Sequence, residues 1–262
     1  MPEFLKIEIK KNFAIVSIKR DPVNSMHLPL WKELAQMLSD LESNEKVRGL
    51  IITSGLSRPI FTAGNDLTEL HAPKTSHERY TEFWRVSNTF LADLSTTSLV
   101  TVAAIHGACP AGGCCLSMCC DYRIATDDVT MGLNEVALGI PVPAVWIKLM
   151  SDLIGKGKTD KIVQFAIMVP AKQCKEIGLI DEIVSKDQLI PAAETLLKQL
   201  LKLPDPGRAI VKGHLRNQLA AEWTDSERLT NESDMGWSML SLPSTVKALD
   251  GVFARLAAKP KL

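Results

Sequence analysis

Two strand-length apolar segments, residues 47–53 and 99–106, are each followed by a glycine-containing turn and then by helix-like sequence. An apolar run of this length predicts a strand that covering helices bury on both faces. Buried strands that alternate with helices are typical of an α/β architecture with right-handed crossovers. The chain is therefore expected to adopt an α/β fold, with the glycine turns at the ends of buried strands.

Local periodicity predicts further elements around these strands. Alternating residues at 4–9 and 13–18 predict a β-hairpin. Thr159 is expected to cap a helix, and Gly178 to close a short helix over 172–177. The capped helix would carry Ile162, Val163, Phe165 and Ala166. Other helices are expected at 28–42, 77–97, 111–120, 188–202, 206–222 and 244–258, and strands at 122–125 and 179–184.

Composition excludes several classes of protein. Of the 262 residues, 46% are hydrophobic and 23% are charged, which excludes a disordered or collagen-like chain. The 30 Lys and Arg residues balance the 30 Asp and Glu residues, so no overall field attracts nucleic acid or an anionic membrane. No apolar run approaches the roughly 18 residues that span a bilayer, so a soluble protein is expected.

Neither a linker nor a shift in composition divides the chain. This favours one α/β core over residues 1–195, continued by a helical region over 196–262. The first residues alternate as in a strand and do not resemble a signal or transit peptide. At the other end, Pro260, Lys261 and Leu262 resemble the peroxisomal targeting tripeptide, with Pro in place of Ser.

Six cysteines occur in the chain, at 109, 114, 115, 119, 120 and 174. A zinc site usually takes two short-spaced ligand pairs, and no second pair accompanies Cys115 and Cys119. Adjacent cysteines on one helix point apart, which argues against a disulfide framework. The cysteines are therefore expected to be free thiols that pack as small hydrophobic residues and hold no metal.

The two glycine-containing turns can supply hydrogen-bond donors to a substrate as well as bend the chain. FTAGNDLTEL at 61–70 and HGACPAGGC at 106–114 each place backbone N–H groups after a strand and beside a helix N-terminus. Two such turns that face each other would form a two-donor oxyanion hole. Alternatively, Gly64, Gly112 and Gly113 simply permit tight turns.

Glu135 lies in an apolar, proline-rich stretch, residues 131–146. A carboxylate desolvated there would have a raised pKa and could transfer protons near neutral pH. Next to Asn134, it could equally be a surface carboxylate at the start of a helix. The sequence supports neither a phosphate-binding loop nor a serine hydrolase. GKGKTD at 155–160 lacks the first glycine of a phosphate-binding loop, and the GxSxG motif of serine hydrolases is not present.

Taken together, these motifs resemble the crotonase (enoyl-CoA hydratase/isomerase) superfamily over nearly the whole chain. DPVNSM, SRPIFTAGNDLTEL, IHGACPAGGC, CDYRIA, GLNEVALGI and AKQCKEIGLIDEIVS occur in the family's order. ACPAGGC and GLNE are most similar to the monofunctional isomerases, which move the double bond of a 3-enoyl-CoA to the trans-2 position in β-oxidation of unsaturated fatty acids. The resemblance implies a crotonase-like spiral of ββα units and C-terminal helices that assemble a homotrimer or a dimer of trimers.

The resemblance also implies roles for individual residues. The N–H groups of Asn65 and Gly112 would form the oxyanion hole for a thioester carbonyl. Family hydratases carry two catalytic carboxylates; the first position falls on Cys115 here and the second is Glu135, which leaves a single base. Ile140, Val142, Val145 and Trp146 would keep water from that base. The substrate would be lined by Ala63, Gly64, Asn65, Asp66, Leu67 and Gly112.

Coenzyme A would enter as part of an acyl-CoA substrate, with no separate cofactor and no metal. The family's role in fatty-acid oxidation implies the mitochondrial matrix or the peroxisome. Two alternatives stay open, namely another crotonase reaction on an acyl-CoA, such as hydration or dienoyl-CoA isomerisation, and a noncatalytic crotonase-fold binding protein, including the kind that binds RNA. The zero net charge and the lack of a Lys/Arg-rich helix disfavour nucleic acid as a partner.

Overall fold

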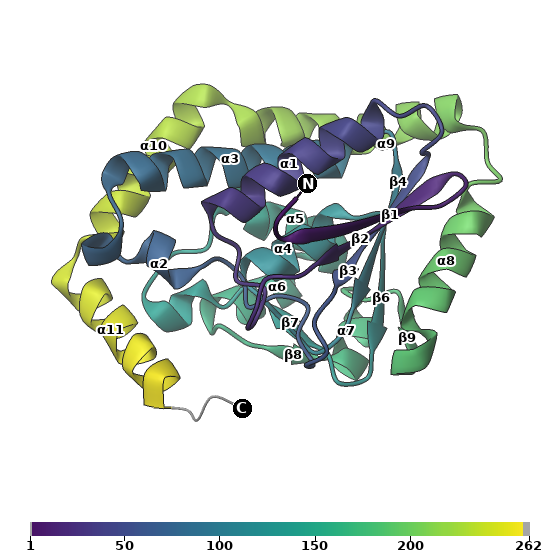
Figure 1. Ribbon diagram of the computed structural model, residues 1–262. Coiled ribbons are helices and arrows are strands. Elements are labelled where there is room, and N and C mark those ends of the chain that lie inside the picture. Colours follow the sequence, from purple (N-terminus) through teal and green to yellow (C-terminus); the bar gives the residue numbers. More distant parts are fainter. Residues whose placement is uncertain (1, 259–262) are drawn as a thin grey trace.

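Strands and helices alternate along the first part of the chain, and helices form its last third, as Figure 1 shows for the computed structural model. The structure describes residues 2–258. The strands are β1 (Leu5–Ile9), β2 (Phe13–Ile18), β3 (Gly49–Ser54), β4 (Val100–Ile105), β5 (Ala108–Pro110), β6 (Tyr122–Thr126), β7 (Thr130–Gly132), β8 (Val169–Pro170) and β9 (Glu182–Val184). The α-helices are α1 (Leu28–Glu42), α2 (Leu67–Leu70), α3 (His77–Thr96), α4 (Gly112–Cys119), α5 (Ala144–Ile154), α6 (Lys156–Gln164), α7 (Ala171–Ile177), α8 (Leu189–Leu200), α9 (Asp205–Thr224), α10 (Ser226–Leu240) and α11 (Pro243–Ala258). Short 3-10 helices are η1 (Ala72–Lys74), η2 (Glu135–Leu138) and η3 (Lys186–Gln188).

The main sheet has the strand order β1-β2-β3-β4-β6-β9. The predicted hairpin makes β1 antiparallel to β2, and the remaining pairs are parallel. A second sheet joins β5, β7 and β8 and lies beside the end of the main sheet, where the glycine turns emerge. The predicted α/β fold with crossover connections is confirmed.

Helices cover both faces of the main sheet, which explains the continuous apolar runs of β3 and β4. Successive residues point to opposite faces, so Leu50 and Ile52 pack into the larger core with α1, α3 and α4. Ile51 points the other way and packs against α8, which lies on the opposite face (Figure 1). Every residue of both strands is buried, as expected for strands covered on two sides.

Two predicted boundaries are wrong. The helix assigned to Thr159 begins at Lys156, because Gly155 at φ 83° turns the chain there; Thr159 lies inside the helix and its hydroxyl donates to the carbonyl of Gly155. Phe165 ends that helix with 73% of its surface exposed instead of packing inward. The strand expected over 179–184 is regular only at Glu182–Val184, although Leu179 and Ile180 are buried before it.

Helix α10 was not predicted by the sequence pattern. Its sequence, SERLTNESDMGWSML, is polar over most of its length and contains Gly236, so the apolar periodicity is weak. Only three of its residues are buried, namely Leu229, Ser233 and Leu240. Its start is capped locally, since the Asp225 side chain accepts from the Arg228 N–H, and along its length it packs against α3.

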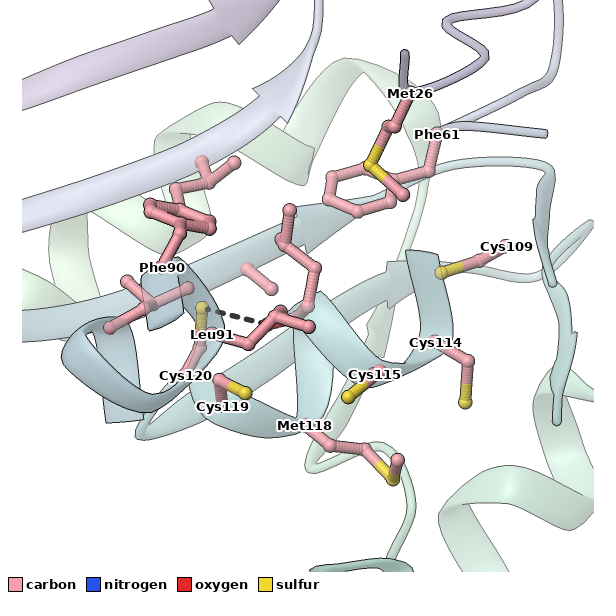
Figure 2. Close-up of a cluster of buried hydrophobic side chains, with 14 of the residues drawn as sticks. Met26, Phe61, Phe90, Leu91, Cys109, Cys114, Cys115, Met118, Cys119 and Cys120 are labelled. Atoms are coloured by element: carbon pink, nitrogen blue, oxygen red, sulfur yellow. Dashed lines mark hydrogen bonds between the residues drawn. The ribbon is translucent and has the colours of Figure 1, made fainter. Parts of the chain in front are cut away.

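The cysteine cluster is part of the hydrophobic core (Figure 2). All six cysteines are free thiols and fully buried. Those of α4 lie among Met26, Phe61, Phe90 and Leu91, and burial raises the pKa of Cys114 and of Cys115. The expectation that the cysteines pack as small hydrophobic residues is confirmed.

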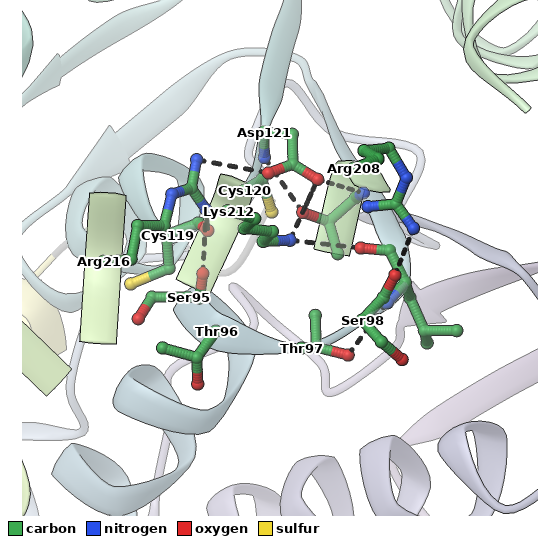
Figure 3. A network of polar contacts seen from close by, with 12 residues as sticks. Ser95, Thr96, Thr97, Ser98, Cys119, Cys120, Asp121, Arg208, Lys212 and Arg216 are labelled. Carbon is green, nitrogen blue, oxygen red and sulfur yellow. Dashed lines mark hydrogen bonds and ion pairs between the residues drawn. The ribbon is translucent and has the colours of Figure 1, made fainter. Parts of the chain in front are cut away.

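An ion-pair network attaches α9 to the core (Figure 3). The ammonium of Lys212 lies 3.0 Å from the Asp121 carboxylate and donates to the carbonyl of Leu99 at 3.1 Å. Arg216 lies 3.2 Å from the same carboxylate and donates to the carbonyls of Ser95 and Cys119. Helix α9 is therefore fixed to the ends of α3 and α4. Among residues 2–258, no helix is both long and apolar enough to cross a membrane.

Candidate active site

The two glycine-containing turns lie against each other. Gly64 has φ 83°, a conformation that favours glycine. A Cβ added there would lie 3.1 Å from the Cβ of Ala111 and from the carbonyl oxygen of Pro110, and 3.7 Å from the amide nitrogen of Gly112. The absence of a side chain at Gly64 thus lets the first turn approach the second, as the oxyanion-hole interpretation requires.

The N–H of Asn65, in the first turn, points away from the segment around Met26. Asn65 pairs with Met26 in a parallel bridge, in which the Met26 N–H donates to the carbonyl of Gly64 (2.8 Å) and the Asp66 N–H donates to the carbonyl of Met26 (3.0 Å). In parallel pairing, the residue between two such bonds turns its own N–H away from the partner segment. The N–H of Asn65 has no hydrogen-bond acceptor among the described residues.

The N–H of Gly112 is also free, because it belongs to the first turn of α4. Such amides have no acceptor within their own helix, and the helix dipole favours negative charge beside them. Ala111, just before it, is held at φ 52° by its N–H bond to the carbonyl of Gly132 (2.8 Å). A backbone strained in this way costs about 1–3 kcal/mol and is common at functional sites. No pattern in the sequence predicts this strained conformation.

Hydrogen bonds of the Asp66 side chain stabilise the first glycine-containing turn. Its carboxylate accepts from the Thr68 N–H (3.0 Å), the Ser25 hydroxyl (2.9 Å) and the Arg20 guanidinium (2.9 Å). Burial alone would raise the pKa of Asp66, but the hydrogen bonds from Thr68 and Ser25 and the charge of Arg20 outweigh it and lower the pKa. The Asp66 side chain therefore binds the protein interior and fixes the residue next to Asn65. Gly64 is buried like Asp66, whereas Ala63 and Leu67 are partly exposed in the same turn.

Glu135 lies at the start of η2, directly after β7. Both of its carboxylate oxygens are buried and have no hydrogen-bond partner among the described residues. Burial raises the pKa of Glu135 to about 7, against a smaller opposing effect of its own backbone N–H. Of the two interpretations left open by the sequence, the desolvated carboxylate is the one observed.

One cavity contains both Asn65 and Glu135. Its volume is about 240 Å³ and its wall is largely apolar. Ile140, Val142 and Trp146 belong to this wall as expected, whereas Val145 is buried behind it. The wall consists of Asn65, Leu70, Tyr80, Trp84, Glu135, Ile140, Pro141, Val142, Pro143, Ala144, Trp146, Glu232, Met235, Gly236 and Leu240. The contributions of α3 and α10 were missed, because they depend on a helix contact that the sequence does not reveal.

Cys115 holds a neutral thiol near Glu135. Burial first, then the neighbouring Cys119 and the charge of Glu135, raise the pKa of Cys115 well above its ordinary value. A neutral thiol does not activate water as a carboxylate does. The described residues also contain no group of three or more His, Cys, Asp or Glu side chains arranged for a metal ion.

This arrangement defines a class of site. Two free amides in adjacent turns can stabilise a negatively charged oxygen, and the buried carboxylate of Glu135, which lines the same cavity as Asn65, can move a proton. The chain belongs to the enoyl-CoA hydratase/isomerase family, whose model matches residues 8–250.

Relatives within the family agree with this assignment. The mitochondrial enoyl-CoA delta isomerase 1 of Homo sapiens is 34% identical over 251 residues, which cover 93% of this chain and 80% of the human protein. The Mus musculus protein of the same name is 34% identical over 79% of this chain and 71% of its own length. The crystal structure of the human mitochondrial delta3-delta2-enoyl-CoA isomerase matches with a TM-score of 0.91 and 32% identity, covering 97% of this chain and 98% of that one. The expected crotonase fold, with its helical C-terminal region, is confirmed.

Proposed function

We propose that this protein is an isomerase that converts 3-enoyl-CoA to trans-2-enoyl-CoA in the β-oxidation of unsaturated fatty acids. The observation that carries the proposal is Glu135, a buried carboxylate without a partner that shares an apolar cavity with Asn65 of the oxyanion turn. The relatives of about one-third identity are named as enoyl-CoA isomerases, which supports the same reaction. The neutral thiol of Cys115, where family hydratases carry a further carboxylate, favours isomerisation over hydration.

The proposed mechanism uses one base. The thioester carbonyl accepts hydrogen bonds from the N–H groups of Asn65 and Gly112, which stabilise the negative charge that develops on its oxygen; one such donor is worth about 3 kcal/mol. Glu135 takes a proton from C2, and the electrons of that bond form a dienolate. The same carboxyl group returns the proton to C4, so the double bond moves from C3–C4 to C2–C3. A single base suffices because C2 and C4 lie on the same side of the dienolate.

The reaction needs no net oxidant, reductant or added water. Coenzyme A therefore enters only as part of the substrate, and we propose neither a separate cofactor nor a metal. The mitochondrial location of the named relatives supports the mitochondrial matrix as the compartment, with the peroxisome as the alternative. The residues of the peroxisome-like tripeptide, 260–262, lie outside the described residues. We further propose an assembly of three subunits or a dimer of trimers, and no nucleic-acid partner.

A turnover assay tests the proposal. Purified protein is supplied separately with 3-octenoyl-CoA and with trans-2-octenoyl-CoA, and the products are separated by chromatography. We expect isomerisation of the first thioester and poor hydration of the second, because the thiol of Cys115 stands where family hydratases carry their other carboxylate. Hydration as fast as isomerisation would contradict the one-base mechanism. Binding of the thioesters without any turnover would contradict enzymatic activity.

A further inference from the structure

A second carboxylate faces the apolar cavity, and the proposed reaction does not use it. Glu232 projects from α10 into the wall of the cavity and forms an ion pair with Arg228, one turn earlier on the same helix. The side chains of both residues are mostly buried, with exposed fractions of 17% and 20%. A charged pair in an otherwise apolar wall is unusual, because desolvation of ionised groups is costly.

Glu232 lies at a different part of the cavity from the proposed base. Its charge contributes to the raised pKa of Tyr80 on α3, after burial. The raised pKa of Glu135 has burial as its cause. Glu232 thus lies on α10 close to Tyr80 of α3, whereas Glu135 lies on η2.

The wall around Glu232 is closely packed. A Cβ added to Gly236 would lie 2.3 Å from the Tyr80 hydroxyl oxygen, so α10 packs against that ring without an intervening side chain. Tyr80 is also stacked on Trp84, with ring centroids 6.0 Å apart, and contacts Trp237 at 6.1 Å. An acyl chain that reached this wall could not easily displace the packed aromatic rings. It would instead cover the ion pair of Glu232 and Arg228.

We infer that Glu232 limits the acyl-chain length that the enzyme accepts, and that the preferred substrates are short- and medium-chain 3-enoyl-CoA thioesters. The inference rests on the proposed isomerase function. A short chain ends before the ion pair and leaves its exposed part, 17% of Glu232 and 20% of Arg228, open to solvent. A long chain would cover that exposed part without offering a hydrogen bond in return, which disfavours binding.

The test compares chain-length profiles of variants. The ratio of kcat/KM for 3-hexadecenoyl-CoA to kcat/KM for 3-hexenoyl-CoA is measured for the wild type, Glu232→Leu and Glu232→Gln. We expect Glu232→Leu to raise this ratio about tenfold or more, because an apolar side chain continues the apolar wall. Glu232→Gln keeps the size of the side chain without its charge and should raise the ratio by a smaller factor. It keeps the test decisive if the leucine variant fails to fold.

Glu227→Leu is the matched control. Glu227 is exposed on the same helix and does not line the cavity, so its removal should change neither the ratio nor the rates. If both Glu232 variants kept the wild-type ratio, the chain would leave the cavity by another route and the inference would be wrong, although the proposed function would stand. If the wild type isomerised none of the thioesters, the proposed function itself would fail, and this inference with it.

Discussion

At Glu135, folding and catalysis make opposite demands on one side chain. A buried carboxylate without a partner is destabilising when it is ionised, yet only the ionised form can accept a proton. Its raised pKa of about 7 keeps both forms accessible near neutral pH, which suits a group that takes a proton and returns it.

The first prediction concerns the role of this group in the reaction. Glu135→Gln keeps the size of the side chain but removes the base, so kcat should fall about 100- to 10,000-fold while the Kd for the thioester changes little. In the wild type, kcat/KM should increase with pH up to about 7 and then level off, because the base must be ionised. Steady-state kinetics over a pH series measures both. A variant with a near wild-type rate would exclude Glu135 as the base.

The second prediction concerns stability. Folding raises the pKa of Glu135 from its ordinary value of 4.5 to about 7, so the folded protein holds the proton more tightly than the unfolded chain. Ionisation therefore opposes folding: the penalty is absent below pH 4.5, develops as the pH rises to 7 and is complete above it. Glu135→Gln should be more stable than the wild type by about 1–3 kcal/mol at alkaline pH. Urea unfolding at pH 8 should reveal this difference in stability between the variant and the wild type, and the difference should vanish near pH 4.5. Equal stability of the two proteins at both pH values would contradict the prediction.

The third prediction concerns Asp66, which we regard as a positioning residue. Asp66→Ala removes the acceptor for Ser25, Thr68 and Arg20 and leaves the Asn65 N–H less well placed. We expect kcat to fall about tenfold to a hundredfold with little change in KM, because the N–H stabilises the transition state more than the bound substrate. Asp66→Asn keeps part of the hydrogen-bond set and should recover part of the activity. A rise in KM by a similar factor, with kcat unchanged, would indicate that Asp66 contacts the substrate instead.

At the scale of elements, predictability follows the range of the interactions involved. The buried strands β3 and β4 and the hairpin of β1 and β2 were predicted because their apolar patterns are local. The start of α6 was misplaced because Gly155, and not a side-chain cap, sets it. Helix α10 was missed because few of its residues are apolar and buried, and the cavity wall that includes Glu232 was missed with it. The site residues Asn65 and Glu135 were found through motifs, whereas the cavity that joins them depends on tertiary packing.

The fourth prediction concerns the attachment of α9. Lys212→Ala should lower the free energy of unfolding by about 2–4 kcal/mol, because it removes a buried ammonium and one of the two cations that face the partly buried Asp121 carboxylate. Lys198→Ala is the control: that lysine forms an exposed pair with Glu194 within α8, and its loss should cost less than about 1 kcal/mol. Denaturant unfolding of the three proteins gives the comparison. Similar losses for both variants would show that the network in Figure 3 does not anchor the helix.

At the scale of the whole molecule, the C-terminal helices leave apolar surface uncovered. On α9, Ile210, Val211 and Leu215 have exposed fractions of 59%, 56% and 77%. The face of this helix that carries Lys212 is fixed to the core, so these residues are presented outwards by a rigid element. A contiguous apolar surface of this kind is typical of a contact between subunits.

The fifth prediction is that this surface joins three copies of the chain. Light scattering should give the mass of a trimer or of a dimer of trimers for the wild type, since an amphipathic helix buries its apolar side only against another surface. Val211→Lys combined with Leu215→Lys should dissociate the assembly, because a charged side chain at a packed contact is costly to desolvate. Ile9→Lys places the same charge on the exposed edge strand β1, where Ile9 is 50% exposed, and should leave the assembly intact. A wild type that is monomeric and fully active would contradict the assembly, whereas a double variant that stays trimeric would place the contact on another surface.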